Sequence, residues 1–162
     1  MKIGRITLSD RASAGIYEDL SGPEIERVVR KIIDSGADFV TRLLPDEQSM
    51  IESALIELAD RECCQLIITT GGTGPSRRDV TPEATRNVIE KELPGFGETM
   101  RAMSFAKIPT AILSRATAGI RGSCLIINLP GNPKAIEQCL CPLSPAVTEC
   151  LVHITPKSKG LD

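Results

Sequence analysis

The chain has 162 residues, of which 41% are hydrophobic, 25% are charged and only 2% are aromatic. This length and composition predict one folded domain with its own core and exclude a chain that is mainly disordered. A formal net charge of −2, three Phe, one Tyr and no Trp argue against a nucleic-acid-binding protein, which needs a basic surface or aromatic platforms for base stacking.

The first half of the chain alternates between strand-like and helical segments. A short strand is expected at residues 3–8 and a second strand at residues 39–44. Between them a helix begins at Ser21, which we expect to form a capping box with Glu24, and ends at Gly36. The apolar residues of this helix recur at helical spacing: Ile25, Val28, Val29, Ile32 and Ile33. After the second strand, Asp46 is expected to cap a helix whose apolar face carries Ile51, Ala54, Leu55 and Leu58.

The second half begins with a continuous apolar run at residues 66–70, which is typical of a strand buried on both faces. A helix is expected to open at Thr81, because Pro82 is tolerated in a first helical turn. Residues 94–97 should break this helix, and a further helix should carry Met100.

Two more strands are expected at residues 111–116 and 124–129, forming an antiparallel edge, and a last helical region follows Pro133. Alternating strands and helices predict an α/β fold with a mostly parallel sheet and helices on both faces. We expect a single domain at residues 1–155 and a polar C-terminal tail at residues 156–162.

The sequence also predicts the environment of the protein. No apolar run approaches the roughly 20 residues of a membrane-spanning helix, and residues 1–8 do not have the pattern of a signal peptide. We therefore expect a cytoplasmic protein. Six cysteines are present, but Cys63 and Cys64 are adjacent, and zinc ligands would have to come from scattered positions. Reduced cysteines that act as small core residues are the favoured interpretation.

Ligands of open α/β sheets bind beyond the carboxyl ends of the strands. Three segments follow strands in this way: residues 9–11, residues 46–47 and residues 69–79. The third segment is rich in glycine, which allows close backbone approach and inward-pointing N–H groups, and the helix after it favours phosphate. A tight glycine turn without a ligand is the alternative. The candidate ligand-binding residues of this loop are Thr70, Gly71, Gly72, Thr73 and Gly74.

Two common phosphate motifs do not fit this loop. A Walker loop ends in Gly-Lys-Ser/Thr, whereas Gly74 is followed by Pro75 and Ser76. The dinucleotide fingerprint needs glycines at the first strand-to-helix turn, where this chain has Ser-Asp-Arg at residues 9–11. Motif matching therefore indicates a phosphate site of unspecified kind.

Charged residues beside the loop extend this hypothesis. Arg77 and Arg78 suit phosphate recognition, although a solvated run of charges is an equal alternative. Asp46 and Asp79 follow different strands, so the fold can bring their carboxylates to one rim, where such a pair holds Mg²⁺. The rigid turn at residues 129–133 is either a wall of the pocket or a plain connection.

Longer motifs carry a family resemblance. Residues 69–75 (TTGGTGP) followed by residues 78–83 (RDVTPE) resemble the signature of the Mog-type molybdopterin adenylyltransferases, which are similar to the gephyrin G domain and its plant counterpart. The resemblance extends over about residues 2–152. A sister family, the molybdenum cofactor biosynthesis B proteins, shares much of the pattern, and the RDVTP run favours the Mog type. Further matches in the same order lie at residues 9–11, 45–47, 94–98, 114–115 and 129–133.

This resemblance implies a fold, an activity and partners. The fold is a three-layer α/β/α, molybdopterin-binding-like architecture, assembled as a homotrimer. The activity is Mg²⁺-dependent transfer of AMP from ATP to molybdopterin, which gives adenylylated molybdopterin and pyrophosphate for a downstream molybdenum-insertion enzyme. The nucleophile is a phosphate oxygen of molybdopterin that is already anionic, so no strong general base is needed. Neither nucleic acid nor a membrane is an expected partner.

The resemblance also assigns residues. Asp46 and Asp79 match the two functional aspartates, as catalytic and metal-binding residues, and Ser114 matches a contact on the pterin side. A non-catalytic molybdopterin-binding or scaffolding module is the alternative, against which the aspartate pair argues, because scaffolding needs no metal-binding pair. A nucleotide-binding regulator is a third alternative. The residues expected to bind the substrates are Ser9, Asp10, Arg11, Thr70, Gly71, Gly72, Thr73, Gly74, Ser114, Arg115, Pro130, Gly131 and Asn132.

Overall fold

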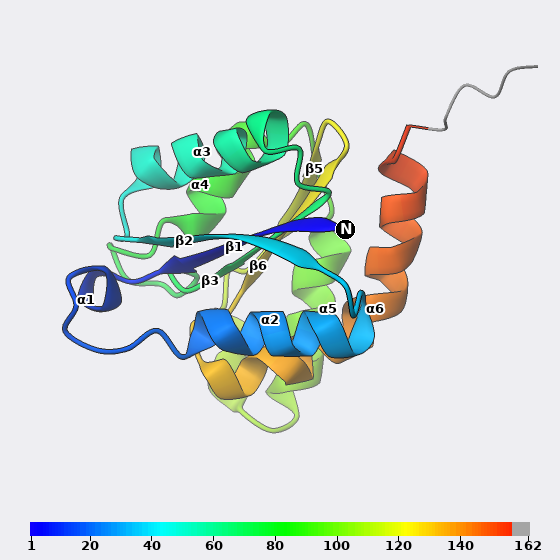
Figure 1. Cartoon of the computed structure of the whole chain (residues 1–162). Helices are drawn as coiled ribbons and strands as arrows, with labels where there is room; N and C mark the ends of the chain where they lie inside the picture. Colours follow the sequence, from blue (N-terminus) through cyan, green and yellow to red (C-terminus); the bar gives the residue numbers. More distant parts are fainter. Residues whose placement is uncertain (157–162) are drawn as a thin grey trace, which may run out of the picture.

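A computed structural model describes residues 1–156 as one mixed sheet between two layers of helices (Figure 1). The tail expected at residues 156–162 lies outside the described residues except for Pro156. The strands are β1 (Lys2–Leu8), β2 (Asp38–Leu44), β3 (Leu66–Thr70), β4 (Lys91–Glu92), β5 (Ala118–Arg121) and β6 (Cys124–Leu129).

The strand order is β2-β1-β3-β6-β5-β4. The strands β2, β1, β3 and β6 are parallel, whereas β5 is antiparallel to both β6 and β4. The predicted α/β fold, with a mostly parallel sheet and an antiparallel edge, is therefore confirmed. Because the chain places β2 on one side of β1 and β3 on the other, the topology reverses at β1 and β3, where such sheets bind ligands.

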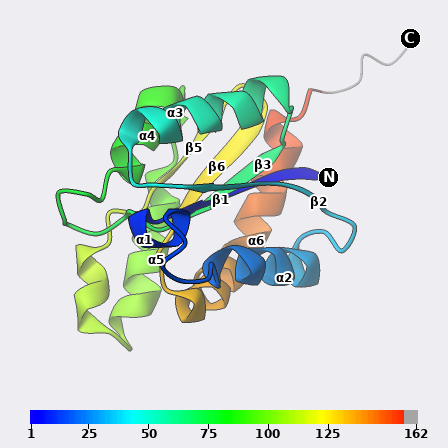
Figure 2. The ribbon, with the colours of Figure 1, turned by 60° about the vertical axis from the view of Figure 1, so that its left-hand side comes forward.

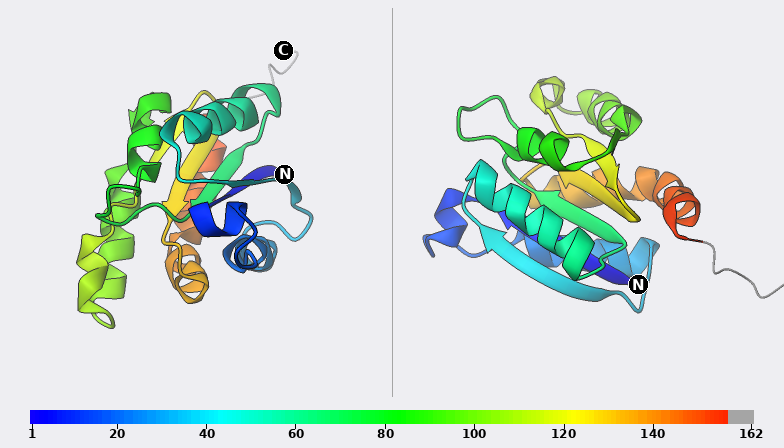
Figure 3. Two further views of the ribbon diagram at one scale, coloured as in Figure 1. Left: turned by 90° about the vertical axis from the view of Figure 1, so that its left-hand side faces the viewer. Right: turned by 90° about the horizontal axis from the view of Figure 1, so that it is seen from above.

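The helices cover both faces of the sheet, as the views in Figure 3 show. One layer holds α3 and α4, and the other holds α2, α5 and α6. Pro142 and Pro145 lie inside α6. Because proline kinks a helix, α6 changes direction along its length. The helices are α1 (Asp10–Ser13), α2 (Ser21–Ile32), α3 (Gln48–Ile56) with its π-helical extension η1 (Glu57–Arg61), α4 (Thr81–Val88), α5 (Pro94–Phe105), the 3₁₀ helix η2 (Pro109–Leu113) and α6 (Pro133–Ile154).

The core is aliphatic, as a chain with 2% aromatic residues requires. The central strands β3 and β6 are buried along their whole length. Cys64, Cys124 and Cys139 are buried among these apolar side chains, whereas Cys63 is exposed. No helix within residues 1–156 is both long enough and apolar enough to cross a bilayer.

The strand predicted at residues 111–116 is wrong. Half of that segment belongs to η2, and the strand β5, which lies between β6 and β4, follows at residues 118–121. Pro109 favours the helical turn that opens η2, and Ile112 is 63% exposed, so these apolar residues do not form a buried strand. The two-residue turn after β5 pairs Arg121 with Cys124, with Gly122 at a φ of +53°. This turn sets the register of β5 against β6.

The ends of α2 also differ from the prediction. Ser21 is the first helical residue and not the N-cap, while Glu24 pairs with Arg27 instead of closing a capping box. The capping carboxylate is that of Asp19, which accepts a hydrogen bond from the backbone of Gly22 at 2.9 Å. The helix ends at Ile32, four residues before the predicted Gly36.

The middle of the chain departs from the prediction in one more respect. The helix α4 begins at Thr81 as expected, but it ends at Val88, before residues 94–97. The short strand β4 then intervenes, and Pro94 is the first residue of α5. Proline in this position opens a helix because its missing N–H would have no partner there.

Candidate functional site

The predicted ligand-binding segments meet at the carboxyl end of the parallel strands. Residues 9–11 follow β1, Asp46 follows β2, the glycine loop of residues 70–74 follows β3, and residues 130–132 follow β6. Figure 2 shows α1 at this end of the sheet, close to the beginning of α2. Parallel pairing of the four strands places these segments along one edge, at the reversal of the topology.

Asp46 is held by Asp10 and not by the helix that follows it. Its Oδ2 accepts a hydrogen bond from Asp10 N at 3.0 Å, and its own N–H donates to Asp10 Oδ1 at 3.0 Å. The N-cap of α3 is Glu47, so the predicted capping role of Asp46 is wrong. Asp46 Oδ1 is buried and has no hydrogen-bond partner among residues 1–156. Burial raises the pKa of Asp46, and the nearby carboxylates of Asp10 and Asp79 raise it further.

The glycine loop lies directly against both aspartates. Gly71 and Gly72 have φ angles of +97° and +63°, which favour glycine. A Cβ on Gly72 would overlap the hydroxyl of Thr81 and lie 2.9 Å from Asp46 Oδ1. A Cβ on Gly74 would lie 2.9 Å from Asp79 Oδ2, which accepts a hydrogen bond from the backbone of Ser76. The loop therefore needs glycine both for its conformation and for its closeness to the two carboxylates.

Two cavities are lined by successive parts of this loop, one by residues 70–72 and the other by residues 73–75. The carboxylate cavity, of about 320 Å³, is lined by Asp19, Asp46 and Asp79 together with Gly71 and Gly72. Its other lining residues include Thr7, Ser9, Tyr17, Ser21 and Thr70.

The Ser114 cavity, of about 450 Å³, is lined by Thr73, Gly74 and Ser114, with apolar residues of α5, η2 and α6. Gly131 borders both cavities, and Pro130 and Asn132 border this one. The two spaces therefore meet along the glycine loop and the turn after β6.

Arg115 holds the glycine loop in place through hydrogen bonds to its backbone. Its Nε donates to Gly74 O at 2.8 Å, and its Nη2 donates to Asp79 O at 2.6 Å. The same guanidinium is paired with Glu83 of α4, and the backbone N–H of Arg115 donates to Thr73 O at 2.8 Å. Arg115 lines neither cavity, so in this structure it holds the loop in shape.

A second arginine lies at the rim. Arg78 makes a bidentate contact with Asp10, at 2.8 and 3.0 Å, and an ion pair with Glu47 at 2.9 Å. The hydrogen bonds from Arg78 lower the pKa of the Asp10 carboxyl. Arg11 lies over the ring of Tyr17, 5.3 Å from its centroid. Asp10 and Arg11, which were expected to bind the substrates, line neither cavity.

Several lining residues were not foreseen from the sequence. Tyr17 and Asp19 come from the loop between α1 and α2, which follows no strand and therefore gave no signal. Arg101 and Ser104 of α5 line the Ser114 cavity, and Arg101 Nη1 donates to Ser114 O at 3.2 Å. A helical segment that reaches the site only through tertiary packing has no local signature for it.

The carboxylate cavity suits a hard divalent cation. Asp46 presents a buried, unpartnered oxygen, and the carboxylate of Asp79 lies close enough to affect its pKa. No group of three or more His, Cys, Asp or Glu able to hold a metal occurs within residues 1–156. Mg²⁺ is commonly held by one or two carboxylates, with water and substrate phosphates completing its shell. The donor set fits an ion whose remaining ligands are water or substrate phosphates.

Comparisons with known proteins agree with this geometry. The family model described as a probable molybdopterin binding domain matches residues 4–149. A Helicobacter pylori protein named molybdopterin adenylyltransferase is 52% identical over 149 residues, which cover 92% of this chain and 85% of the relative. The Escherichia coli K12 protein of that name is 48% identical over 153 residues, covering 94% and 78%.

Solved structures give the same picture. A MogA structure superposes with a TM-score of 0.88 at 34% identity and covers 96% of this chain and 100% of its own. The molybdopterin biosynthesis enzyme MoaB of Thermus thermophilus superposes with a TM-score of 0.86 at 40% identity, covering 98% and 99%. The three-layer fold expected from the sequence motifs is therefore that of MogA and MoaB.

Proposed function

The chain belongs to the molybdopterin-binding domain family, and on that premise we propose that it is a molybdopterin adenylyltransferase of molybdenum cofactor biosynthesis. It transfers AMP from ATP to the terminal phosphate of molybdopterin and releases pyrophosphate. The relatives at about 50% identity that carry this name support the assignment. The observation that carries it is the pair of cavities that share one glycine loop in their walls, of which one is lined by carboxylates and the other by largely apolar residues.

The two cavities suggest a division of the substrates. We assign ATP to the carboxylate cavity, where Asp46 and Asp79 lie, and the pterin to the Ser114 cavity, whose apolar walls suit a flat ring system. The glycine loop between them is then the place where the molybdopterin phosphate meets the α-phosphate of ATP. Backbone N–H groups of such a loop stabilise phosphate oxygens.

Positioning is the main task of the protein in this reaction. The attacking phosphate oxygen is already anionic at neutral pH, so no residue has to remove a proton from it. The difficulty is the approach of one anion to another, and fixed N–H donors and close placement reduce that barrier. Arg115 contributes by holding Gly74 and the backbone of Asp79 in place.

Asp46 and Asp79 would hold Mg²⁺ in the carboxylate cavity. The ion, when bound, neutralises charge on the phosphates of ATP and on the departing pyrophosphate. Asp46 Oδ1 is the best-placed oxygen of this chain for the role, because it is buried and has no protein partner among residues 1–156. Asp46 Oδ2 stays on the Asp10 backbone, which keeps the carboxylate turned toward the loop.

We also propose a homotrimer that passes adenylylated molybdopterin to a molybdenum-inserting enzyme in the cytoplasm. Large apolar side chains exposed on α5, on η2 and in the turn between them support an assembly: Met103, Phe105, Ile108, Ile112 and Leu113 are 46–63% exposed. Light scattering at micromolar concentration should give three times the mass of one chain. A monomeric mass would overturn the trimer.

A direct assay tests the reaction. The protein is incubated with molybdopterin, ATP and Mg²⁺, and pyrophosphate and adenylylated pterin are measured together. We expect both products in equal amounts, and neither when any one component is left out. Tight molybdopterin binding without pyrophosphate would instead identify a non-catalytic binding or scaffolding module.

A further inference from the structure

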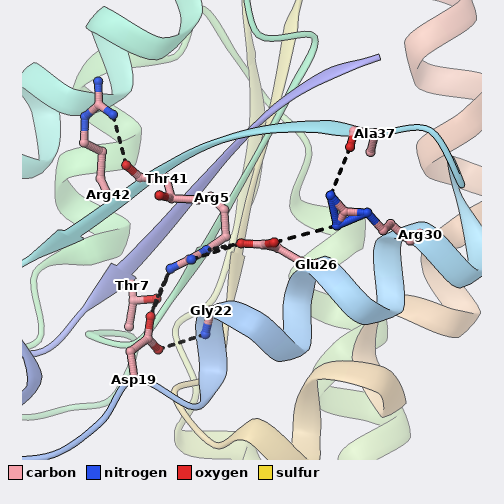
Figure 4. A network of polar contacts seen from close by, with 9 residues as sticks. All are labelled: Arg5, Thr7, Asp19, Gly22, Glu26, Arg30, Ala37, Thr41 and Arg42. Atoms are coloured by element: carbon pink, nitrogen blue, oxygen red, sulfur yellow. Dashed lines mark hydrogen bonds and ion pairs between the residues drawn. The ribbon is translucent and has the colours of Figure 1, made fainter.

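A half-buried ionic network joins β1, α2 and the loop between α1 and α2 (Figure 4). Arg5 lies at its centre, and only 12% of its side chain is exposed. Its Nη1 donates to Asp19 Oδ2 at 2.9 Å, and its Nη2 donates to Glu26 Oε1 at 3.0 Å. An enclosed guanidinium is tolerated only when its charge is paired, and Arg5 has a carboxylate partner on each side.

Asp19 is the residue through which this network reaches the candidate site. Besides Arg5, its carboxylate accepts hydrogen bonds from Thr7 Oγ1 at 2.8 Å and from Gly22 N at 2.9 Å. Asp19 and Thr7 both line the carboxylate cavity, whereas Arg5 does not. A Cβ on Gly22 would overlap the Arg5 guanidinium and Asp19 Oδ2, so the beginning of α2 is packed closely against the pair. The position of Asp19 is thus fixed from three sides.

The loop that Asp19 anchors forms one wall of the carboxylate cavity. Residues 17–21 all line that cavity, and none of them lines the Ser114 cavity. Ile16 and Leu20 are 64% and 62% exposed, so apolar packing does little to hold the loop. Polar contacts hold it instead, including Tyr17 OH to Ser9 Oγ at 2.7 Å. The Arg5–Asp19 pair is the only one of these contacts that joins two opposite charges, since the others involve neutral donors or acceptors.

We infer that Arg5 is a positioning residue for the nucleotide half of the reaction. Through Asp19 it holds the loop of residues 15–20 as the wall against which ATP binds. Arg5 acts at a distance, because it lines neither cavity. Only the identity of the occupant, ATP, rests on the proposed function. Molybdopterin binding in the Ser114 cavity should not depend on Arg5.

The first test separates the two substrates. Arg5→Leu removes the ion pair and fills much of the space, while Glu26→Gln is the matched control that removes the other partner of Arg5 and leaves Asp19 untouched. We expect Arg5→Leu to raise KM for ATP by about tenfold with an unchanged Kd for molybdopterin, since small misplacements near a reacting centre have effects of this size or larger. Glu26→Gln should change neither KM for ATP nor Kd for molybdopterin. Arg5→Lys should raise KM for ATP less than Arg5→Leu does, because an ammonium still pairs with Asp19 although it lacks the planar fork of a guanidinium.

A second readout needs no turnover. Tyr17 is the single tyrosine of a chain without tryptophan, so its fluorescence reports on this loop alone. Acrylamide should quench Tyr17 more strongly in Arg5→Leu than in the parent and in Glu26→Gln. Asp19→Asn, which keeps the size of the side chain, serves as a second variant with the same expected result should Arg5→Leu not fold.

The outcomes are distinct. If the parent protein released no pyrophosphate, the proposed function would fail, while the quenching comparison would still test the anchoring of the loop. An unchanged KM for ATP in Arg5→Leu and in Asp19→Asn would overturn the inference. Equal rises in KM for ATP and in Kd for molybdopterin would show that Arg5 only stabilises the fold. Equal effects of Arg5→Leu and Glu26→Gln would show the same, and either result would overturn the inference.

Discussion

Asp10 and Asp46 exchange two hydrogen bonds of 3.0 Å, each from the backbone N–H of one residue to the carboxylate of the other. This reciprocal pair ties the turn after β1 to the turn after β2. It occupies Asp46 Oδ2 and leaves Oδ1 buried and unpartnered beside Gly72. The buried carboxylate of Asp46 is therefore held by Asp10 in an orientation that leaves Oδ1 free to bind a ligand.

This arrangement predicts that Asp46 reduces stability at neutral pH. Burial raises the pKa of Asp46 in the folded protein, so the folded state binds this proton more tightly than the unfolded chain does. Stability therefore falls as the pH rises from the unfolded pKa through the folded pKa. We expect Asp46→Asn to melt at a higher temperature than the parent at about pH 7, with the difference vanishing at about pH 3, below the usual pKa of aspartate.

Asp60 provides a control for which the effect of the substitution on the melting temperature has the opposite sign. Its hydrogen bonds with Arg121 lower its pKa, so its stabilising effect is present above the unfolded pKa and is lost as the pH falls. Asp60→Asn should therefore lower the melting temperature at about pH 7. Thermal melts of the three proteins across pH measure both effects, and a lower melting point of Asp46→Asn at neutral pH would contradict the burial of an ionised carboxylate there.

The glycine loop gives a second prediction. Gly72→Ala places a methyl group in a left-handed backbone, against Thr81 and 2.9 Å from Asp46 Oδ1. We expect activity to fall by about a hundredfold or more, since the reacting groups are displaced. Gly122→Ala is the control, because its φ is also positive but its Cβ meets open space. It should cost about 1 kcal/mol of stability and leave the activity intact. Comparable activity of the two variants would remove the loop from the site.

Much of this architecture was predictable because its determinants are local. Strands such as residues 66–70 are continuous apolar runs, and Pro82 lies in the first turn of α4, as its position after Thr81 predicts. Residues that follow strands in the sequence lie at one edge of a parallel sheet, so Asp46 and the glycine loop could be grouped in advance. The segment at residues 111–116 misled because its two large apolar residues, Ile112 and Leu113, are exposed, which sequence alone does not reveal.

Long-range contacts could not be predicted in this way. Asp46 has a residue type suited to capping, but its partner is Asp10, 36 positions away. Arg115 was expected to contact a substrate, and whether it does so stays a prediction. In the structure its guanidinium contacts the backbone of the loop and Glu83. Such pairings depend on which loops the fold brings together.

Arg115 supplies a third prediction. Lysine at this position keeps the charge but cannot contact Gly74 O, Asp79 O and Glu83 at once. We expect Arg115→Lys to lower kcat by about tenfold or more, because the loop and Asp79 lose the hydrogen bonds that hold them to one guanidinium. Arg86→Lys is the control, since Arg86 pairs with Glu92 at the surface, away from both cavities. Steady-state kinetics of both variants test this prediction. Equal kcat values would show that the contacts of the Arg115 guanidinium are not needed for catalysis.

Ser114 gives a prediction for the other cavity. Its hydroxyl is a candidate hydrogen-bond partner for the pterin, and losing such a bond typically weakens binding by about tenfold. We expect Ser114→Ala to raise the Kd for molybdopterin by this factor without changing KM for ATP. Ser144→Ala, in which the lost hydroxyl contacts only the α6 backbone, is the control. A raised KM for ATP with unchanged pterin affinity would reverse the assignment of the two cavities.

The most direct measurement of the central claim compares molybdopterin binding and pyrophosphate release in the same preparations of Asp46→Asn and Asp79→Asn. Both carboxylates act on the ATP side, so each variant should bind molybdopterin with parental affinity. Pyrophosphate release should fall by about a hundredfold or more, the usual effect of removing one well-placed electrostatic group. Parental rates of pyrophosphate release in both variants, or loss of pterin binding in both, would contradict the assignment of Asp46 and Asp79 to the nucleotide and its metal ion.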